Sequence, residues 1–343
     1  YTTLFRSGRK KLTIKKLSNY LGKVVEHNIQ SSLMIWGAPG IGKSSVISSV
    51  AKEHNLELID LRISQLAPTD LRGIPVPKDD TAYWYPPEFL PTSGKGILFL
   101  DEINMAPPAV QGIAQQLILD RKVGNYKVPD GWFIWSAGNR KEDFAAVFDM
   151  PAPLANRFIH LEVKTGLDEF KDYALRNNID DRIISFLNFR PKYLHKIDKN
   201  SPSWPSPRSW DIGDKLLKAN LDLDPAIGQG CASEFRGFCK VYKSLPDIPT
   251  ILSGDMSPKF PEDLSARYAL TCALAVRAKT IKEVENAFLY IDKKGDMEWL
   301  SQCTYDVSTI WKSNKKVNEL VDMIIANDKL MSVADKLQKL LAA

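Results

Sequence analysis

The stretch GAPGIGKSS, residues 37–45, constrains the fold more than any other part of the sequence. It follows the short apolar run SLMIW and precedes a segment whose apolar residues have helical spacing. Its two outer glycines, Lys43 and Ser44 fit the pattern G-x-x-x-x-G-K-[ST], in which glycines let backbone N–H groups curl around phosphate oxygens. A strand, this loop and a helix in succession predict an α/β protein with a phosphate-binding loop.

The residue types in this loop match the chemistry of a bound nucleotide. Lys43 is expected to neutralise the β- and γ-phosphates, and the hydroxyl of Ser44 is a ligand for Mg²⁺. The helix that begins near Lys43 adds its positive N-terminal dipole. The alternative is a glycine turn that binds nothing. The predicted nucleotide-binding residues of the loop are Gly37, Ala38, Pro39, Gly40, Ile41, Gly42, Lys43, Ser44 and Ser45.

Short apolar runs alternate with helical segments up to about residue 163. The runs are rich in β-forming residues and bounded by turns, which predicts buried parallel strands in a helix-covered sheet. The expected strands are SLMIW (32–36), LELIDL (56–61), GILFLDE (96–102), WFIWSAG (132–138) and FIHLEV (158–163). After residue 166 only helical spacing is found. The expected helices include residues 44–54, 107–122, 168–178, 181–190, 209–220, 264–279, 281–294, 298–313 and 336–343.

The expected organisation has four parts. They are a basic N-terminal segment (1–30), an α/β core (31–165), a helical lid (166–225) and a helical C-terminal extension (226–343). A proline-rich loop (190–207) and an irregular link (241–261) interrupt the helical part.

Charge and composition exclude some functional classes. No apolar run approaches the ~18–20 residues of a membrane helix, so no membrane association is expected. The four cysteines form no C-x-x-C pair, which argues against a zinc site and indicates reduced thiols in the cytoplasm. The positive residues that precede Glu26 either contact nucleic acid or an acidic partner, or form a solvated helix face. They are Arg6, Arg9, Lys10, Lys11, Lys15, Lys16 and Lys23.

A pair of carboxylates, Asp101 and Glu102, ends the apolar run GILFLDE. Ligands of open α/β sheets bind at the carboxyl edge of the strands. Asp101 is therefore expected to bind Mg²⁺ and the nucleotide, and Glu102 to polarise an attacking water as a general base. The alternative is surface charge at the end of a strand.

Two further polar residues are candidates for the reaction. Asn139 follows a predicted strand and could orient the lytic water, although asparagine also favours turns. Arg157 lies between a proline-rich turn and a predicted strand, where it either caps the turn or reaches for a phosphate.

Six motifs together resemble the AAA+ ATPases of the MoxR group. In order, over residues 31–212, they are GAPGIGKS, APTDLRG, ILFLDEINMAPPAVQ, SAGN, PLANRF and SPRSW. The MoxR group belongs to a wider set that includes midasin, dynein-related modules and the motor subunits of metal chelatases. One departure is Asn156, where the family often has an aspartate before the arginine.

The resemblance implies an AAA+ P-loop core with an α-helical lid, ATP and Mg²⁺ as ligands, and roles for the candidate residues. Lys43 and Ser44 correspond to Walker A, Asp101 and Glu102 to Walker B, and Asn139 to sensor 1. Arg157 corresponds to an arginine finger that acts in trans. Arg208 corresponds to sensor 2, and the alternative is that it caps the loop between Pro207 and the next helix. It further implies a homo-oligomer, expected to be a hexameric ring, that remodels or activates a partner protein with a von Willebrand A domain.

Two other functions remain open from the sequence. The basic N-terminus allows a nucleic-acid-directed translocase or restriction-type motor, and a nucleotide-gated scaffold with little turnover is the non-enzymatic alternative. Glu102 argues against the scaffold. The aromatic segment 71–96 is expected to form a hairpin or ordered loop, with its aromatics more often packed than free to contact a substrate.

Overall fold

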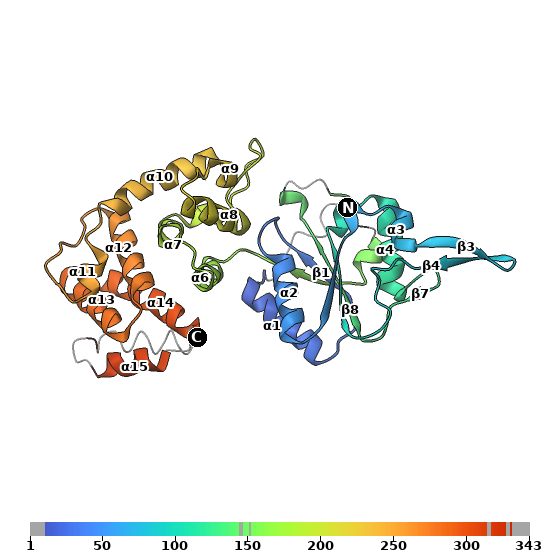
Figure 1. Cartoon of the computed structure of the whole chain (residues 1–343), viewed down its shortest axis with the longest axis horizontal. Helices are drawn as coiled ribbons and strands as arrows, with labels where there is room; N and C mark the ends of the chain where they lie inside the picture. The colour runs from blue at the N-terminus through green and yellow to red at the C-terminus, as the bar shows by residue number, and fades with distance from the viewer. Residues whose placement is uncertain (1–10, 144–146, 151, 314–316, 327–329, 331–343) are drawn as a thin grey trace. The chain divides into compact units, whose positions relative to one another are not determined.

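The computed structural model describes residues 11–143, 147–150, 152–313, 317–326 and 330, and the chain divides into two compact units (Figure 1). The first unit spans residues 1–166 and the second residues 167–343. The division falls one residue after the boundary expected between core and lid. Within the described ranges, no helix is both long and apolar enough to cross a membrane.

A five-stranded parallel sheet forms the centre of the first unit, in the order β2-β5-β8-β1-β9. Its strands are β1 (Leu33–Trp36), β2 (Glu57–Arg62), β5 (Gly96–Asp101), β8 (Trp132–Gly138) and β9 (Ile159–Glu162). All five predicted strands are thus confirmed. Two antiparallel hairpins lie outside the sheet, β3–β4 (Ile74–Lys78, Thr81–Tyr85) and β6–β7 (Lys122–Val123, Tyr126–Lys127).

Helices cover both faces of this sheet (Figure 1), because successive strand residues point to opposite faces. Ile97 and Phe99 of β5 pack with α1 (Ile14–Glu26) and α2 (Lys43–Glu53), whereas Leu98 and Leu100 pack with α4 (Pro108–Asp120). The α-helices of the unit are α1 (Ile14–Glu26), α2 (Lys43–Glu53), α3 (Pro68–Arg72), α4 (Pro108–Asp120) and α5 (Ala152–Ala155). Short 3₁₀ segments are Ile63–Gln65, Ile103–Met105 and Lys141–Asp143.

Helix α1 occupies much of the predicted basic segment. The Thr13 side chain accepts a hydrogen bond from the backbone N–H of Lys16 and caps the helix. Its buried residues are Leu17, Leu21 and Val24, and its exposed lysines are Lys15, Lys16 and Lys23. These three lysines therefore lie on the solvated side of a helix that packs on the sheet. Residues 1–10 lie outside the described part of the chain.

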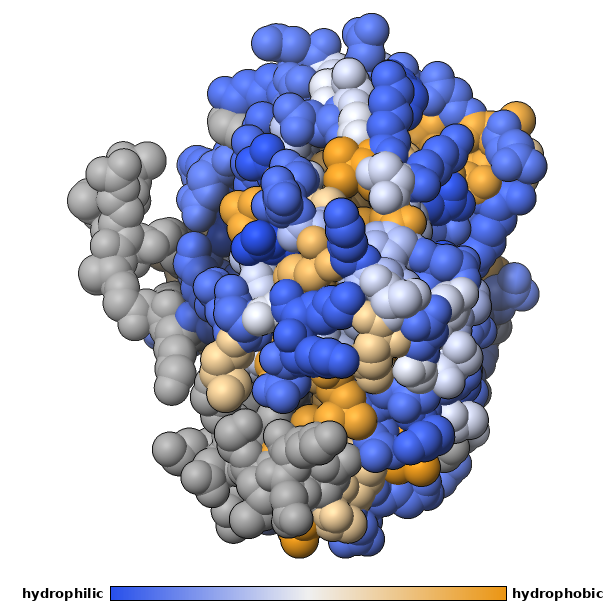
Figure 2. Space-filling view, turned by 90° about the vertical axis from the view of Figure 1, so that its left-hand side faces the viewer, coloured by the Kyte–Doolittle hydropathy of each residue, from blue (hydrophilic) through white to orange (hydrophobic). Residues whose placement is uncertain are grey.

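The second unit consists of helices in its described residues. They are α6 (Leu167–Arg176), α7 (Asp181–Phe189), α8 (Pro207–Lys218), α9 (Asp224–Ile227), α10 (Gln229–Lys243), α11 (Ile248–Leu252), α12 (Leu264–Arg277), α13 (Ile281–Lys294), α14 (Met297–Ser313) and α15 (Val317–Ile325), with a 3₁₀ turn at Pro191–Tyr193. On the face shown in Figure 2, apolar residues at the surface occur in small groups bordered by polar residues. The predicted helix at 336–343 lies outside the described residues.

The prediction of an irregular link over 241–261 is wrong in part. The link contains the end of α10 and all of α11. Asp247 caps α11 by accepting from the backbone N–H of Thr250 (3.1 Å), and Ile248, Ile251 and Leu252 are buried. A good N-cap and three buried apolar residues stabilise this short helix despite the neighbouring turn residues.

An aromatic cluster joins the predicted lid to the predicted extension. Phe186 and Trp210 come from the lid, and Phe235 and Phe238 from α10. The ring centroid of Phe235 lies 5.4 Å from that of Phe186 and 5.7 Å from that of Trp210. Such aromatic pairs add to the hydrophobic gain of their burial. The boundary expected at residues 225 and 226 therefore falls inside one compact unit.

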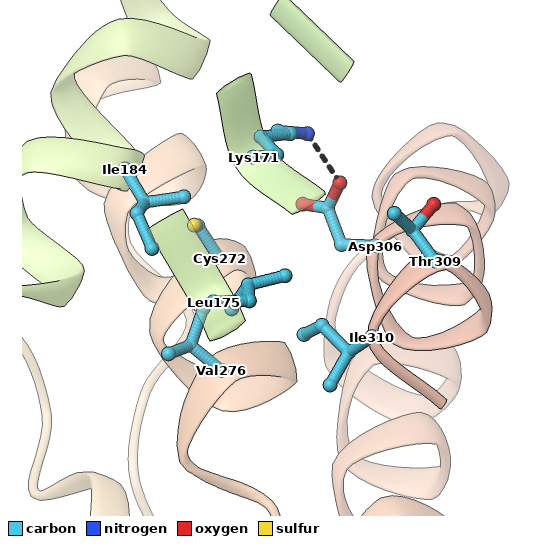
Figure 3. A pocket seen from close by; sticks show the side chains of 8 residues that line it. All are labelled: Lys171, Leu175, Ile184, Cys272, Val276, Asp306, Thr309 and Ile310. Carbon is cyan, nitrogen blue, oxygen red and sulfur yellow. Dashed lines mark hydrogen bonds and ion pairs between the residues drawn. The ribbon is translucent and has the colours of Figure 1, made fainter. Parts of the chain in front are cut away.

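A buried ion pair links α6 to α14. Lys171 Nζ lies 2.6 Å from Asp306 Oδ1, and the two side chains are only 6% and 5% exposed. The other carboxylate oxygen, Oδ2, has no hydrogen-bond partner among the described residues. Figure 3 shows this pair at the edge of a small pocket, whose other lining residues are Leu175, Ile184, Cys272, Val276, Thr309 and Ile310.

Lys171→Met should lower the free energy of unfolding of the second unit by about 3–5 kcal/mol, because the buried Asp306 charge loses its cation and keeps only the Gln302 amide as a donor. Urea unfolding of the full chain followed by circular dichroism measures the loss. The double variant Lys171→Met/Asp306→Leu should recover most of it. Lys282→Met breaks an exposed pair with Glu285 and is the matched control. Equal shifts for the two single variants would contradict the prediction.

Candidate active site

Three neighbouring strands bring the predicted site residues together. In the sheet β5 lies next to β8, and β8 next to β1. The loop 37–42 follows β1, Asp101 ends β5, and Asn139 follows β8. The carboxyl ends of parallel strands meet at one edge of a sheet, so these groups share one edge.

The backbone of the loop 37–42 requires glycine at defined positions. Gly40 and Gly42 have φ angles of +77° and +98°, a region that other L-residues rarely adopt. At Gly37 a Cβ would lie 3.2 Å from the backbone carbonyl oxygen of Val163 and 2.6 Å from the movable end of the Ile41 side chain, so this position is tight but less restricted. Helix α2 begins at Lys43, so its first backbone N–H groups have no carbonyl partner within the helix and are available to an anion.

Lys43 is buried in this loop with its amine held by three oxygens. Its Nζ donates to the carbonyl oxygens of Gly37 (2.7 Å) and Ala38 (3.0 Å), and to Oδ1 of Asn139 (3.0 Å). A buried ammonium needs such partners, because burial without them is costly. The amine thus lies between the phosphate-binding loop and the end of β8, where phosphate oxygens would compete for it.

Ser44 and Asp101 form a direct contact. The Ser44 hydroxyl donates to Asp101 Oδ2 (2.9 Å), and the backbone N–H of Glu102 donates to Asp101 Oδ1 (2.9 Å). A hydroxyl and a carboxylate in contact are a pair of hard oxygen ligands of the kind that Mg²⁺ prefers. These two residues therefore fit the predicted magnesium site.

Glu102 lies in a strained backbone conformation. Its φ and ψ angles are +56° and +30°, in the left-handed region that is uncommon for a residue other than glycine. Its Oε2 accepts from the hydroxyl of Ser64 (2.6 Å), which lies just after β2. Strained residues cluster at functional sites, and here the 3₁₀ segment that follows β2 supplies the hydrogen bond that fixes the carboxylate.

Asp60 adds a third carboxylate that the sequence did not single out. Partial burial and the charge of Asp101 raise the pKa of Asp60, Glu102 adds to the increase, and Arg62 opposes it. Neighbouring carboxylates repel each other, which disfavours the charged form of Asp60. Alternation along LELIDL places Asp60 on the opposite face of the strand from Ile59 and Leu61. The sequence does not show that β2 lies beside β5, and it is this pairing that brings Asp60 close to the end of β5.

Asn139 is fixed by a second asparagine, Asn104, whose position the sequence pattern did not indicate. Asn104 Nδ2 donates to the carbonyl oxygen of Asn139 (2.7 Å), and Asn104 Oδ1 accepts from its N–H (3.2 Å). Gly138 permits this approach, because a Cβ there would lie 2.4 Å from Asn104 Oδ1. The pair keeps the Asn139 side chain oriented towards Lys43.

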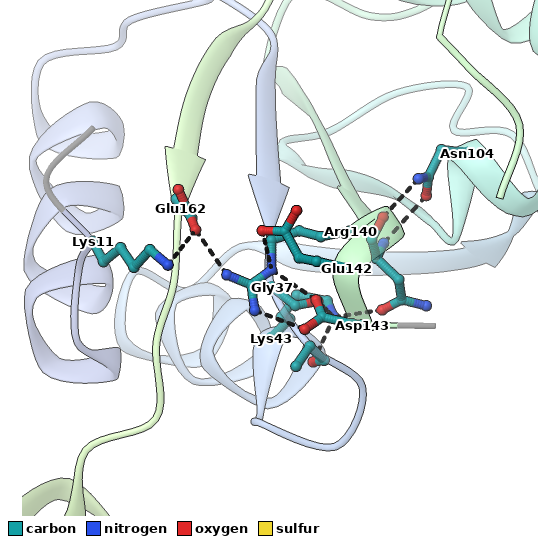
Figure 4. Close-up of polar contacts among 10 residues, drawn as sticks. Lys11, Gly37, Lys43, Asn104, Arg140, Glu142, Asp143 and Glu162 are labelled. Atoms are coloured by element: carbon teal, nitrogen blue, oxygen red, sulfur yellow. Dashed lines mark hydrogen bonds and ion pairs between the residues drawn. The ribbon is translucent and has the colours of Figure 1, made fainter. Parts of the chain in front are cut away.

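Arg140 clamps the segment after Asn139 to the sheet (Figure 4). Its Nε and one terminal nitrogen donate to both oxygens of Asp143 (2.7 and 2.8 Å), and the other terminal nitrogen donates to Glu162 of β9 (2.7 Å). Lys11 also pairs with Glu162 (3.2 Å). The hydrogen bonds to Asp143 and Glu162 raise the pKa of Arg140, although burial opposes them. Arg140 therefore holds the fold together through these hydrogen bonds.

Arg157 is exposed and differs from Arg140 in its contacts. Its backbone N–H donates to the carbonyl of Leu154 (3.2 Å), which closes the turn after α5. Among the described residues its guanidinium makes no hydrogen bond or ion pair. Pro151, in the proline-rich turn before Arg157, lies outside the described residues.

Arg208 belongs to the second unit. It is exposed in the first turn of α8, whose N-terminus is capped by the side chain of Ser206. A cation is unfavourable at a helix N-terminus, where the macrodipole favours anions. Ser206 already caps the helix, so capping does not explain why an arginine is there. The contact of Arg208 with nucleotide stays a prediction.

The aromatic segment forms the predicted hairpin, β3–β4. Its Tyr83 and Tyr85 side chains are 39% and 50% exposed, with ring centroids 5.0 Å apart. Trp84 is half-buried, with the guanidinium of Arg72 4.9 Å from its ring centroid. The expectation that the aromatics are mostly packed is therefore wrong for the two tyrosines. Alternation along the strand places them on the face opposite Trp84.

Comparisons with known proteins agree with this geometry. Residues 32–149 match the family described as an AAA domain of the dynein-related subfamily. The first unit has the AAA+ P-loop fold. Midasin from Giardia intestinalis is 25% identical over 216 residues, which are 59% of this chain and 4% of that protein. The chain therefore spans a small part of the length of this curated relative.

Solved structures resemble the chain at low identity. The Holliday junction branch migration motor RuvB from Thermotoga maritima is 19% identical, with 80% of this chain and 86% of that chain covered and a TM-score of 0.42. NtrX from Brucella abortus in complex with ATP is 16% identical, with coverages of 91% and 70% and a TM-score of 0.39.

Proposed function

We propose that this chain is an ATP hydrolase of the MoxR type, acting in the cytoplasm as a homo-oligomer, expected to be a hexameric ring, that remodels a partner protein. The observation that carries the hydrolytic part is the position of Glu102. It directly follows the Ser44–Asp101 contact, at the edge where the phosphate-binding loop and Asn139 also lie. The MoxR assignment rests on the order of the six motifs.

The binding step uses the loop and the start of α2. Backbone N–H groups of residues 37–44 would surround the phosphates, and Lys43 would exchange its carbonyl partners for phosphate oxygens. Ser44 and Asp101 would hold Mg²⁺, which neutralises the charge of the phosphate oxygens when bound. Asp60 adds negative charge beside this pair.

The hydrolytic step uses Glu102 as the general base for a water. Its Oε2 is engaged by Ser64, so a water would be held by the other oxygen or would require that contact to open. Asn139 is within reach of Lys43 and is placed to orient the water or the γ-phosphate. Arg157, supplied by a neighbouring subunit, would stabilise the charge that develops on the transferred group.

The client is proposed to be a protein with a von Willebrand A domain, which the resemblance implies. A tagged Glu102→Gln chain should bind ATP and hold this client, so that the client co-purifies in ATP and not in ADP. The wild-type chain should hold the same client with a non-hydrolysable ATP analogue and release it with ATP. Lys43→Ala, which loses the phosphate contact, is the matched control.

The alternative motor function gives a different result in the same experiment. Recovery of nucleic acid with the Glu102→Gln chain, in an amount that falls steeply between about 50 and 200 mM salt, would favour a translocase. The exposed Lys15, Lys16 and Lys23 of α1 would then be the first residues to neutralise.

A further inference from the structure

A hydrogen bond joins the end of β1 to β9 on one face of the sheet. In the parallel pair, Met34 lies opposite His160 and Trp36 opposite Glu162. Trp36 and His160 are therefore diagonal neighbours on the same face. The indole Nε1 of Trp36 donates to Nδ1 of His160 (2.8 Å), with the two ring planes 11° apart.

The second ring nitrogen of His160 contacts the turn that carries Arg157. His160 Nε2 lies 2.6 Å from the carbonyl oxygen of Ala155, the last residue of α5. The indole N–H can only donate, so Nδ1 of His160 accepts and carries no proton. Nε2 then carries the proton and donates to Ala155. The two contacts thus define a neutral imidazole in a single tautomer.

The carbonyl of Ala155 is the centre of the turn that presents Arg157. It accepts from His160 and from the backbone N–H of Phe158 (3.3 Å). Leu154 is fully buried and anchors the other side of the turn. Arg157 lies between these two anchors, and its guanidinium is exposed.

The other end of the contact is the phosphate-binding loop. Trp36 directly precedes Gly37, whose carbonyl oxygen accepts from Lys43 (2.7 Å) and whose N–H donates to Gly138 (3.3 Å). Any ligand that draws Lys43 away changes the partners of Gly37. The Trp36–His160–Ala155 contacts then connect that residue to the Arg157 turn by two hydrogen bonds.

We propose that His160 is a positioning residue. It holds the turn at Ala155 so that Arg157 points to the nucleotide site of a neighbouring subunit, and it connects this turn to the phosphate-binding loop of the subunit to which His160 itself belongs. This inference rests on the proposed function, in which Arg157 acts in trans. It adds a residue that touches neither nucleotide nor water and acts through the turn at Ala155.

Two conservative substitutions separate the two hydrogen bonds of His160. In His160→Asn the amide oxygen takes the place of Nδ1 and keeps an acceptor for Trp36, but the donor to Ala155 is lost. In His160→Gln the amide nitrogen takes the place of Nε2 and keeps a donor for Ala155. The position of Arg157 should depend on the hydrogen bond from residue 160 to the carbonyl oxygen of Ala155. His160→Gln should therefore keep Arg157 in place, and His160→Asn should not.

Mixtures of two inactive chains test the proposal. A Glu102→Gln chain lacks the base and donates Arg157, whereas an Arg157→Ala chain has an intact site and accepts it. Their mixture should regain ATP hydrolysis. Adding His160→Asn to the donor should lower the regained kcat about tenfold with little change in KM, and His160→Gln should lower it less than about threefold. The same substitutions in the acceptor should change kcat less than about twofold.

Each outcome separates the inference from the proposed function. If the parent mixture regains nothing although mixed oligomers form by native mass spectrometry, the trans role of Arg157 in the proposed function is wrong. If the parent mixture works and the His160→Asn donor rescues it fully, the inference about His160 is wrong. Equal losses of regained kcat for His160→Asn in the donor and in the acceptor would show a merely structural role and overturn the inference. A His160→Gln donor that regains as little kcat as the His160→Asn donor would overturn it as well.

Discussion

Glu102→Gln should lower kcat for ATP hydrolysis by about 10²–10⁴-fold, the usual contribution of a general base, and leave the affinity for ATP within about twofold of wild type. The reason is geometric as well as chemical. The amide keeps the shape of the side chain and can still accept from Ser64, so the strained backbone at φ +56° is retained. What is lost is the ability to take a proton from water.

Steady-state hydrolysis and equilibrium binding of a fluorescent ATP analogue measure the two quantities separately. Glu88→Gln is the control, because Glu88 is an exposed glutamate in the loop between β4 and β5 of the same unit. Its kcat should equal that of wild type. Equal rates for Glu102→Gln and wild type would remove the hydrolase assignment, and the nucleotide-gated scaffold would then be the better description.

Those parts of the site that are local in sequence could be predicted from it. The loop 37–45 is defined by glycine spacing and by its place between a strand and a helix, and both follow from near neighbours in the chain. Asp101 and Glu102 end an apolar run, so their place at the sheet edge follows from strand length alone. The same holds for Asn139 after β8.

Contacts between distant segments could not be predicted in this way. Ser64 reaches Glu102, and Asp60 approaches Asp101, because β2 lies beside β5 in the sheet. His160 reaches Trp36 across 124 residues. No pattern in one sequence fixes strand order, so these residues looked like ordinary members of strands and turns. The aromatic cluster that joins α7, α8 and α10 was missed for the same reason.

Arg157 is the residue for which sequence and structure together predict the largest effect. A guanidinium stays charged, and its planar donors can hold two phosphate oxygens at once. Arg140, seventeen residues earlier, already donates hydrogen bonds to Asp143 and Glu162. The guanidinium of Arg157 is exposed and has no hydrogen-bond partner among the described residues, so it can meet a group outside its own subunit.

Arg157→Ala should therefore lower kcat by about 10³–10⁵-fold in the assembled protein, the range known for arginine fingers, while ATP still binds. Arg176→Ala, which removes an exposed arginine of α6, should leave kcat unchanged. A kcat of Arg157→Ala close to wild type would mean that the guanidinium only covers the turn after α5, and that each subunit completes its own site.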